Sequence, residues 1–154
     1  VLSRFTMGQI LEETDFKLLS GREYVENFIK QVVIGAMQPE DAKKYIVEDS
    51  LLITPGDRED IIETALECTR QNDKEALKIS GIILSGGFKP AQPVLERLQK
   101  TKVPVLLADE DTYSVASAIH DMTVKIKPRD NEKIKRIIDL VKEQVDLDAI
   151  LKGM

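Results

Sequence analysis

Short runs of apolar residues alternate with segments rich in glycine, proline and aspartate along most of this chain. The clearest run is Ile82-Ile83-Leu84, which is too short for a helix and is typical of a strand buried on both faces. Ser85-Gly86-Gly87 ends this run, and Pro90 and Pro93 stand where the first turn of a helix accepts proline. Residues 80–93 therefore predict a strand, a glycine turn and the start of a helix in succession.

The same succession recurs on both sides of residues 80–93. Further strands are predicted at residues 16–19, 28–34, 51–53 and 104–108, with an additional edge strand at 123–126. The connections are too long for hairpins, so neighbouring strands should be parallel and covered by helices on both faces. The predicted fold class is α/β, with a mostly parallel sheet of about five strands.

Apolar residues at helical spacing predict the helices that cover this sheet. Thr6 and Gln9 form a capping box before a short helix, and Asp57 is placed to cap a helix from Arg58 to about Arg70. The core-facing positions of that second helix are predicted to be Ile61, Ile62, Ala65, Leu66 and Thr69. Other helices are predicted near residues 42–46, 94–98 and 112–120, and the strongest amphipathic pattern is Ile134, Ile137, Ile138 and Val141, extended by Val145, Leu147, Ile150 and Leu151.

Composition and charge narrow the class of protein. A chain of 154 residues predicts one domain, and its net charge of −5 without a basic block argues against nucleic acid and anionic membranes as partners. No stretch approaches the ~20 apolar residues of a membrane span. The single cysteine, Cys68, excludes an intrachain disulfide, so a reducing, cytoplasmic compartment is expected. Its place on the apolar face of a helix predicts a buried structural thiol.

The turns that follow the strands are the candidate site. In a parallel sheet they open on one edge, so the turns at residues 35–38, 54–58, 85–89 and 109–112 should converge. Backbone N–H groups and helix N-termini gathered there favour an anion. The alternative is that these residue types serve only turn and capping chemistry. The predicted ligand-binding residues are Gly35, Thr54, Gly56, Asp57, Arg58, Ser85, Gly86, Gly87, Asp111 and Thr112.

Strong catalytic signatures are missing from the sequence. It contains neither a phosphate loop of the Gly-x-x-x-x-Gly-Lys-Ser/Thr type nor a Gly-x-Ser-x-Gly elbow. His120, the only histidine, is interpreted as a partner of the helix C-terminus or of Asp121 rather than as a base. The acidic run at residues 109–111 has no His or Cys nearby, so it is a weak metal signal. We therefore predict no catalytic residue, metal or cofactor.

Several segments together resemble the DRTGG domain family, which is named for its Asp-Arg and Thr-Gly-Gly motifs. Asp57-Arg58 matches the first motif, and Ser85-Gly86-Gly87 matches the second with serine in place of threonine, which keeps the hydroxyl. Further family-like segments are residues 33–37, 104–107, 111–113 and 119–126. The resemblance covers roughly residues 25–130, which form the core of a single domain spanning 1–154, with a helix and strand before it and an amphipathic helix after it.

The resemblance implies a regulatory role within larger proteins. Similar domains occur in long phosphate acetyltransferases, after an ATPase-like module resembling dethiobiotin synthetase, and beside CBS modules in some pyrophosphatases. The fold is expected to be similar to the N-terminal domain of HPr kinase/phosphatase. Because the chain opens with Val1 rather than Met, we interpret it as a fragment or processed product, matching the C-terminal part of an ATPase-like-plus-DRTGG protein.

Three functions follow from these observations. The first is a non-catalytic, ligand-sensing domain that binds a small anionic metabolite or nucleotide. The second is a structural module for oligomerisation of a larger phosphotransacetylase-like or ATPase-like protein. The third, which ranks lowest, is a catalytic fragment of an acyl- or phosphoryl-transfer enzyme. The apolar C-terminal residues Val145, Leu147, Ile150 and Leu151 also lead us to expect a homodimer.

Overall fold

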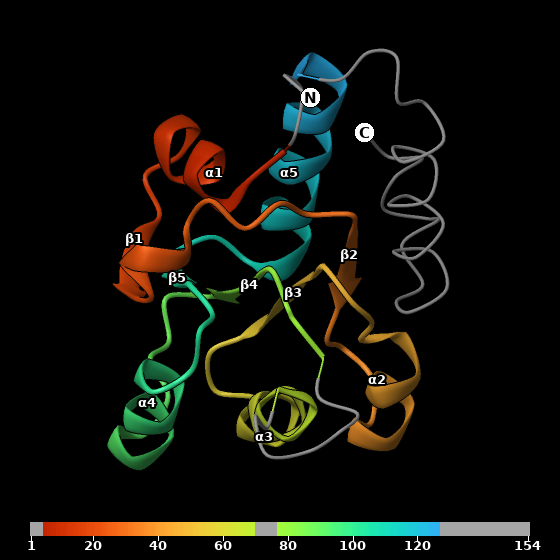
Figure 1. Cartoon of the computed structure of the whole chain (residues 1–154), viewed down its shortest axis with the longest axis vertical. Coiled ribbons are helices and arrows are strands. Elements are labelled where there is room, and N and C mark those ends of the chain that lie inside the picture. Colours follow the sequence, from red (N-terminus) through yellow and green to blue (C-terminus); the bar gives the residue numbers. More distant parts are fainter. Residues whose placement is uncertain (1–4, 70–76, 127–154) are drawn as a thin grey trace.

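The computed structural model describes residues 5–69 and 77–126, which form a five-stranded sheet flanked by helices (Figure 1). The strand order is β1-β5-β4-β3-β2, with β1 at Lys17–Ser20, β2 at Gln31–Ile34, β3 at Ser50–Pro55, β4 at Gly81–Ser85 and β5 at Val105–Leu107. Strands β2 to β5 pair in parallel, and β1 pairs with β5 in the antiparallel direction at one edge. The predicted α/β class and mostly parallel sheet are confirmed.

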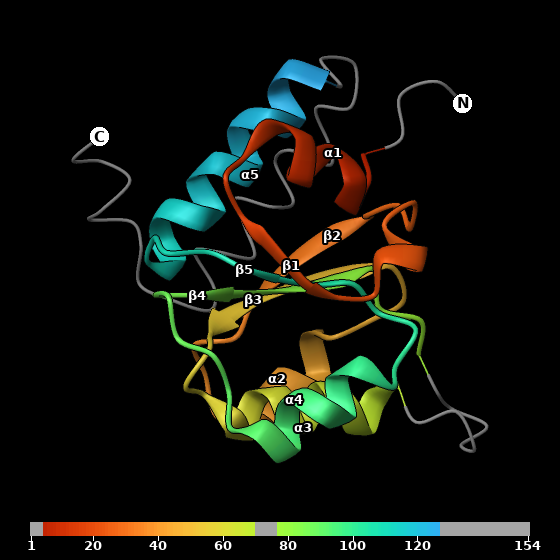
Figure 2. The same cartoon turned by 90° about the vertical axis from the view of Figure 1, so that its left-hand side faces the viewer.

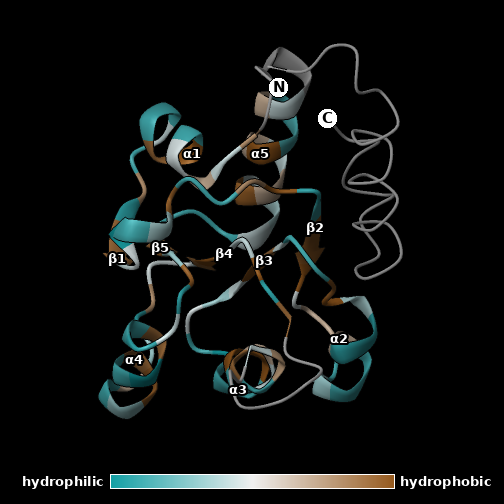
Figure 3. Cartoon of the chain, viewed as in Figure 1, coloured by the Kyte–Doolittle hydropathy of each residue, from teal (hydrophilic) through white to brown (hydrophobic). Residues whose placement is uncertain are grey.

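Helices cover both faces of the sheet, as parallel strand connections require (Figure 2). Helices α2 (Pro39–Tyr45), α3 (Glu59–Cys68) and α4 (Gln92–Gln99) lie on one face, and α1 (Met7–Glu13) and α5 (Thr112–Ile126) lie on the other. The distribution of polarity in Figure 3 agrees with this layered arrangement, because β2 is hydrophobic and the outward turns of α2 are hydrophilic. The helices thus turn their polar residues to water and their apolar residues to the strands.

The two central strands supply side chains to both layers of the core. On β3, Leu51 and Ile53 pack with α1 and α5, whereas Leu52 packs with the α2–α4 layer. On β4, Ile83 belongs to the first layer, and Ile82 and Leu84 belong to the second. Successive residues of a strand point to opposite faces, so a continuous apolar run is what two covered faces demand.

Helix α1 begins with the predicted capping box. The Gln9 backbone N–H donates to Thr6 Oγ1 over 3.2 Å, and the Thr6 N–H donates to Gln9 Oε1 over 3.0 Å. This cap places Met7, which is fully buried, against Gly81 at the start of β4. A Cβ at residue 81 would lie 2.3 Å from Met7 Cε, so the Met7 side chain occupies the space beside Gly81 where the helix crosses the strand.

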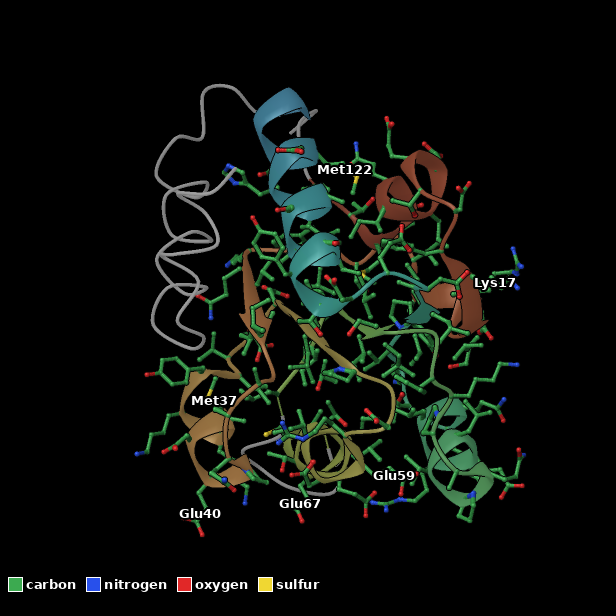
Figure 4. All side chains as sticks on the ribbon, turned by 180° about the vertical axis from the view of Figure 1, so that it is seen from behind. Lys17, Met37, Glu40, Glu59, Glu67 and Met122 are labelled. Atoms are coloured by element: carbon green, nitrogen blue, oxygen red, sulfur yellow. The ribbon has the colours of Figure 1, made fainter. Side chains whose placement is uncertain are left out.

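Two predicted elements differ from the structure. Residues 123–126 are the last part of α5 and not an edge strand. The buried residues Val115, Ile119 and Met122 continue the helical spacing, which outweighs the brief alternation of Val124 and Lys125. Met122 lies on the side of α5 that faces α1 (Figure 4), in the same apolar cluster as Met7 and Ile10.

Helix α3 is also capped differently from the prediction. The N-cap residue is Arg58 and not Asp57, because the Arg58 N–H closes a turn onto the Pro55 carbonyl over 3.0 Å before the helix starts. The helix ends at Cys68, and Thr69 is its C-cap. Thr64 is buried and donates its hydroxyl to the Asp60 carbonyl over 2.9 Å, whereas Thr69, at the end of the helix, is only partly buried.

Some predicted features lie outside the described residues. They are the polar connection at 71–75, the amphipathic helix around residues 134–141 and its apolar extension to residue 151. The segment at 22–27, for which the sequence favoured no element, begins with a single 3-10 turn at Arg22–Tyr24. None of the described helices is long and apolar enough to cross a membrane.

We expect Ile83→Ala to lower the free energy of unfolding by about 2–5 kcal/mol, because it opens a cavity in the centre of β4. Ile83 is 0% exposed. The matched control is Val47→Ala at a site that is 38% exposed, where the change should be within about 0.5 kcal/mol. Denaturant unfolding followed by circular dichroism measures both, and equal effects of the two substitutions would contradict the assigned core.

Candidate functional site

The turns after β2, β3, β4 and β5 meet at one edge of the sheet and bind one another. The Gly56 N–H donates to the Ser85 carbonyl over 3.1 Å, which joins the β3 turn to the β4 turn. The Gly86 N–H donates to Glu110 O over 2.7 Å, and the Gly87 N–H donates to Ala108 O over 2.8 Å. These bonds join the β4 turn to the β5 turn, so the edge is a hydrogen-bonded unit.

Glycine is required at three positions of this unit. Gly86 and Gly87 have φ of 79° and 73°, in the left-handed region that glycine enters without strain. A Cβ on Gly56 would lie 1.6 Å from the Phe88 carbonyl oxygen, so the β4 turn rests directly on the β3 turn. The N–H groups of all three glycines donate to backbone carbonyls of neighbouring turns, and these hydrogen bonds hold the turns together.

Hydroxyl groups complete the contacts below these turns. Ser85 Oγ lies 2.6 Å from Thr112 Oγ1, which ties the end of β4 to the start of α5. Thr54 is buried on β3 and donates its hydroxyl to the Gly35 carbonyl over 2.9 Å. Gly35 has no room for a side chain, because a Cβ there would lie 2.7 Å from Ile61 Cγ2. The hydroxyls therefore join β4 to α5 and β3 to the turn after β2.

Arg58 is held on two sides of its guanidinium. Nε and Nη2 donate to the two carboxylate oxygens of Asp60 over 3.0 and 3.1 Å, and Nη2 also donates to the Met37 carbonyl over 2.9 Å. The ion-pair partner of Arg58 is thus Asp60, two residues further along the chain. Among the described residues Nη1 has no hydrogen-bond partner, and 32% of the side chain is exposed.

The Arg58–Asp60 pair shifts both groups toward their charged forms. The hydrogen bonds from Arg58 lower the pKa of Asp60, and the hydrogen bonds to Asp60 raise the pKa of Arg58. Asp60 also accepts the Ile61 N–H over 2.9 Å at the start of α3. One carboxylate therefore offsets the unfavourable position of a cation at a helix N-terminus.

Acidic residues at the same edge serve the adjoining helices. Asp111 accepts the Ser114 N–H over 2.7 Å and caps α5. Glu59 lies between α3 and α4 (Figure 4), and accepts the Ala91 N–H over 2.8 Å. Asp57 is exposed and contributes a nearby negative charge to Arg58. The described residues contain no group of three or more His, Cys, Asp or Glu side chains able to hold a metal ion.

His120 and Cys68 are both at least partly buried in helices. The interpretation of His120 as a partner of the helix C-terminus is wrong, because α5 continues to Ile126. Its Nδ1 atom is buried without a hydrogen-bond partner among the described residues. Cys68 is half-buried at the end of α3, and burial raises the pKa of its thiol, which keeps it protonated.

Sequence reasoning missed one residue at this edge, Phe88. Its side chain is 51% exposed, although it is large and apolar. The available signal was its position: an aromatic residue placed after Gly86-Gly87, inside a turn where polar residues are usual.

The chain matches the DRTGG domain family over residues 9–122. It belongs to the DRTGG family. The match starts earlier and ends earlier than the range of roughly 25–130 that the motifs suggested, and it includes most of α1 and all of β1. The two motifs of this DRTGG domain, Asp57-Arg58 and Ser85-Gly86-Gly87, are neighbouring turns that the Gly56–Ser85 hydrogen bond joins.

Relatives of this DRTGG domain are larger proteins. A phosphate acetyltransferase of Nitratidesulfovibrio vulgaris is 28% identical over 148 residues, covering 94% of this chain and 21% of that protein. A cobalt-dependent inorganic pyrophosphatase of Clostridium perfringens is 27% identical over 117 residues, covering 76% of this chain and 20% of that protein. The chain thus spans about a fifth of the length of these curated relatives.

A solved structure shares the fold. The CBS and DRTGG domains of the regulatory region of the Clostridium perfringens pyrophosphatase, crystallised with the activator diadenosine tetraphosphate, align with a TM-score of 0.61 and 27% identity. The alignment covers 76% of this chain and 46% of the other. In that protein the DRTGG domain is part of a regulatory region.

We expect Gly56→Ala to lower the free energy of unfolding by about 1–3 kcal/mol or more, because the Phe88 carbonyl leaves no space for a methyl group. The matched control is Gly8→Ala in α1, where the nearest atom would be 3.4 Å away and alanine favours the helix. Thermal and denaturant unfolding measure both variants. A Gly56→Ala protein as stable as Gly8→Ala would contradict the close packing of the two turns.

The lowered pKa of Asp60 predicts a pH-dependent contribution to stability. A carboxyl whose pKa is lower in the folded than in the unfolded state stabilises the fold above the unfolded value, about 3.9, and this contribution is lost as the pH falls through the folded value. The stability difference between the native chain and Asp60→Asn should be constant near neutral pH and shrink below about pH 4.

Denaturant unfolding between pH 2 and pH 7 measures this difference. Glu12→Gln, at an exposed position of α1, is the control for the general effect of removing a carboxylate. The difference for Asp60→Asn should be modest because the pair is half-exposed. A difference that does not change with pH would contradict a charged Arg58–Asp60 pair.

Proposed function

We propose that this chain is a non-catalytic regulatory domain of a larger enzyme, such as a phosphate acetyltransferase, and that it senses a small anionic metabolite or nucleotide. The ligand would bind at the edge formed by the turns after β2 to β5. The observation that carries this proposal is Arg58, whose guanidinium is held by three hydrogen bonds while Nη1 has no partner among the described residues. Membership of the DRTGG family and the regulatory setting of its solved relative support the regulatory role.

Arg58 is suited to an anion because its position is already ordered. Two N–H groups remain on Nη1 after Nε and Nη2 are engaged. A phosphate or carboxylate oxygen that accepts from Nη1 meets a cation whose rotamer does not have to be ordered on binding. The Arg58 side chain is 32% exposed, so part of it is accessible from water.

The remaining predicted site residues would support this contact. Gly35, Thr54, Gly56, Ser85, Gly86, Gly87 and Thr112 would keep the turns in register through the hydrogen bonds described above. Asp111 would hold the start of α5, and exposed Asp57 would lie at the margin of the ligand. We propose that binding strengthens contacts among the turns, which would transmit the ligand signal to attached domains.

We expect a thermal-shift screen of ATP, diadenosine tetraphosphate, acetyl phosphate and pyrophosphate, each with and without Mg²⁺, to raise the melting temperature for at least one ligand. Saturation at 100 times the dissociation constant adds about 2.7 kcal/mol, which corresponds to several degrees for a domain of this size. Arg58→Ala should remove this shift, and Arg58→Lys should reduce it because the planar fork is lost.

The matched control is Arg97→Ala, which removes another exposed arginine whose ion pair with Glu63 lies between α3 and α4. This variant should keep the full ligand shift. If no compound raises the melting temperature and Arg58→Ala alone lowers it strongly, Arg58 is structural and the proposal fails. Sedimentation of the same protein would then test the alternative, an assembly module that forms a homodimer.

A further inference from the structure

We propose that the ligand is a nucleotide whose base stacks on Phe88 while its phosphate contacts Arg58. This inference rests on the proposed function and goes further, because it names the ligand class and adds a residue that the DRTGG motifs do not contain. Its starting point is the exposure of Phe88, which is 51%. The other large hydrophobic residue exposed within the described part of the chain, Val47, is 38% exposed and follows α2.

The backbone around Phe88 is held firmly. Gly86 and Gly87 before it adopt positive φ and donate to the carbonyls of Glu110 and Ala108. The Phe88 carbonyl rests against Gly56, and Pro90 after it is buried. Because these contacts anchor the turn, the aromatic side chain is presented to water from an ordered backbone rather than from a loose loop.

The Phe88 ring lies against Gly86. A Cβ on Gly86 would lie 3.0 Å from Phe88 Cδ2 and Cε2, so the absence of a side chain at residue 86 makes room for the ring. The ring thus lies close to Gly86, while about half of the residue stays exposed. An aromatic ring that is half-exposed on an ordered turn offers a face on which a nucleobase can stack.

Phe88 and Arg58 come from turns in direct contact. Gly56 lies two residues before Arg58 in the chain. Its N–H donates to the Ser85 carbonyl, and it packs against the Phe88 carbonyl. A nucleotide carries a flat base and a charged phosphate in one molecule, whereas acetyl phosphate and pyrophosphate lack the base. An exposed aromatic ring on one turn and a cation with unused N–H groups on the adjoining turn therefore favour nucleotides over simple phosphate compounds.

The test uses isothermal titration calorimetry of the whole chain with ATP, diadenosine tetraphosphate and inorganic tripolyphosphate. We expect Phe88→Ala to weaken binding of the two nucleotides by about tenfold or more and to leave tripolyphosphate binding unchanged. Val47→Ala, at the other exposed hydrophobic position, should change neither. Melting temperatures of the unliganded variants show whether each protein is folded.

A second variant gives a direct signal of stacking. The chain has no tryptophan, so Phe88→Trp introduces a single indole. We expect ATP to quench its fluorescence and to bind at least as tightly as to the native chain, because the larger ring stacks on the base. Tripolyphosphate should leave the fluorescence unchanged.

The outcomes separate this inference from the proposed function. If Arg58→Ala abolishes nucleotide binding but Phe88→Ala binds nucleotides as the native chain does, the anion site stands and the stacking proposal is wrong. Equal affinity of the native chain for ATP and tripolyphosphate also overturns stacking alone. If the native chain binds none of these compounds, both proposals fail.

Discussion

Burial of β3 and β4 on both faces is the constraint on which this structure depends. The side chains of Leu51, Leu52, Ile53, Ile82, Ile83 and Leu84 are at most 2% exposed and alternate between two apolar layers. Strands of this kind are stable only when helices cover both faces, and parallel pairing requires each connection to cross from one end of the sheet to the other. Every βα turn is thereby brought to the same edge. The location of the candidate site is a consequence of how the core is covered.

The turns at that edge are joined more closely than topology requires. Backbone donors of Gly56, Gly86 and Gly87 bind carbonyls of neighbouring turns, and the Ser85 and Thr112 hydroxyls bind each other. The Ser-Gly-Gly motif of this DRTGG domain therefore has a structural role that is independent of any ligand. Arg58 and Phe88 differ from it, because each presents chemical groups to water that the described contacts leave unused.

An edge of hydrogen-bonded turns that also carries exposed groups able to contact a ligand suits a regulatory domain. When the turns of a site are already hydrogen-bonded, ligand binding loses little free energy to ordering the backbone. A ligand that makes different contacts in two states of an attached domain can then favour one of those states. The chain spans about a fifth of its curated relatives, and one solved relative places the DRTGG fold beside CBS domains in a regulatory region. Ligand sensing at the edge and transmission to neighbouring domains together form our proposal for this chain.

The sequence alone determined the class of the fold and the place of the turns. Buried runs such as Ile82-Ile83-Leu84 and the capping box at Thr6 and Gln9 are local signals, since a few consecutive residues decide strand burial or helix start. Only the tertiary structure decided the partner of Arg58, the exposure of Phe88 and the helical state of residues 123–126. Arg58 is the N-cap of α3 and pairs with Asp60 in the first turn of that helix. Residues 123–126 are helical because Met122 and Thr123 are buried. These features depend on which surfaces meet in space, and residue spacing along the chain does not record that information.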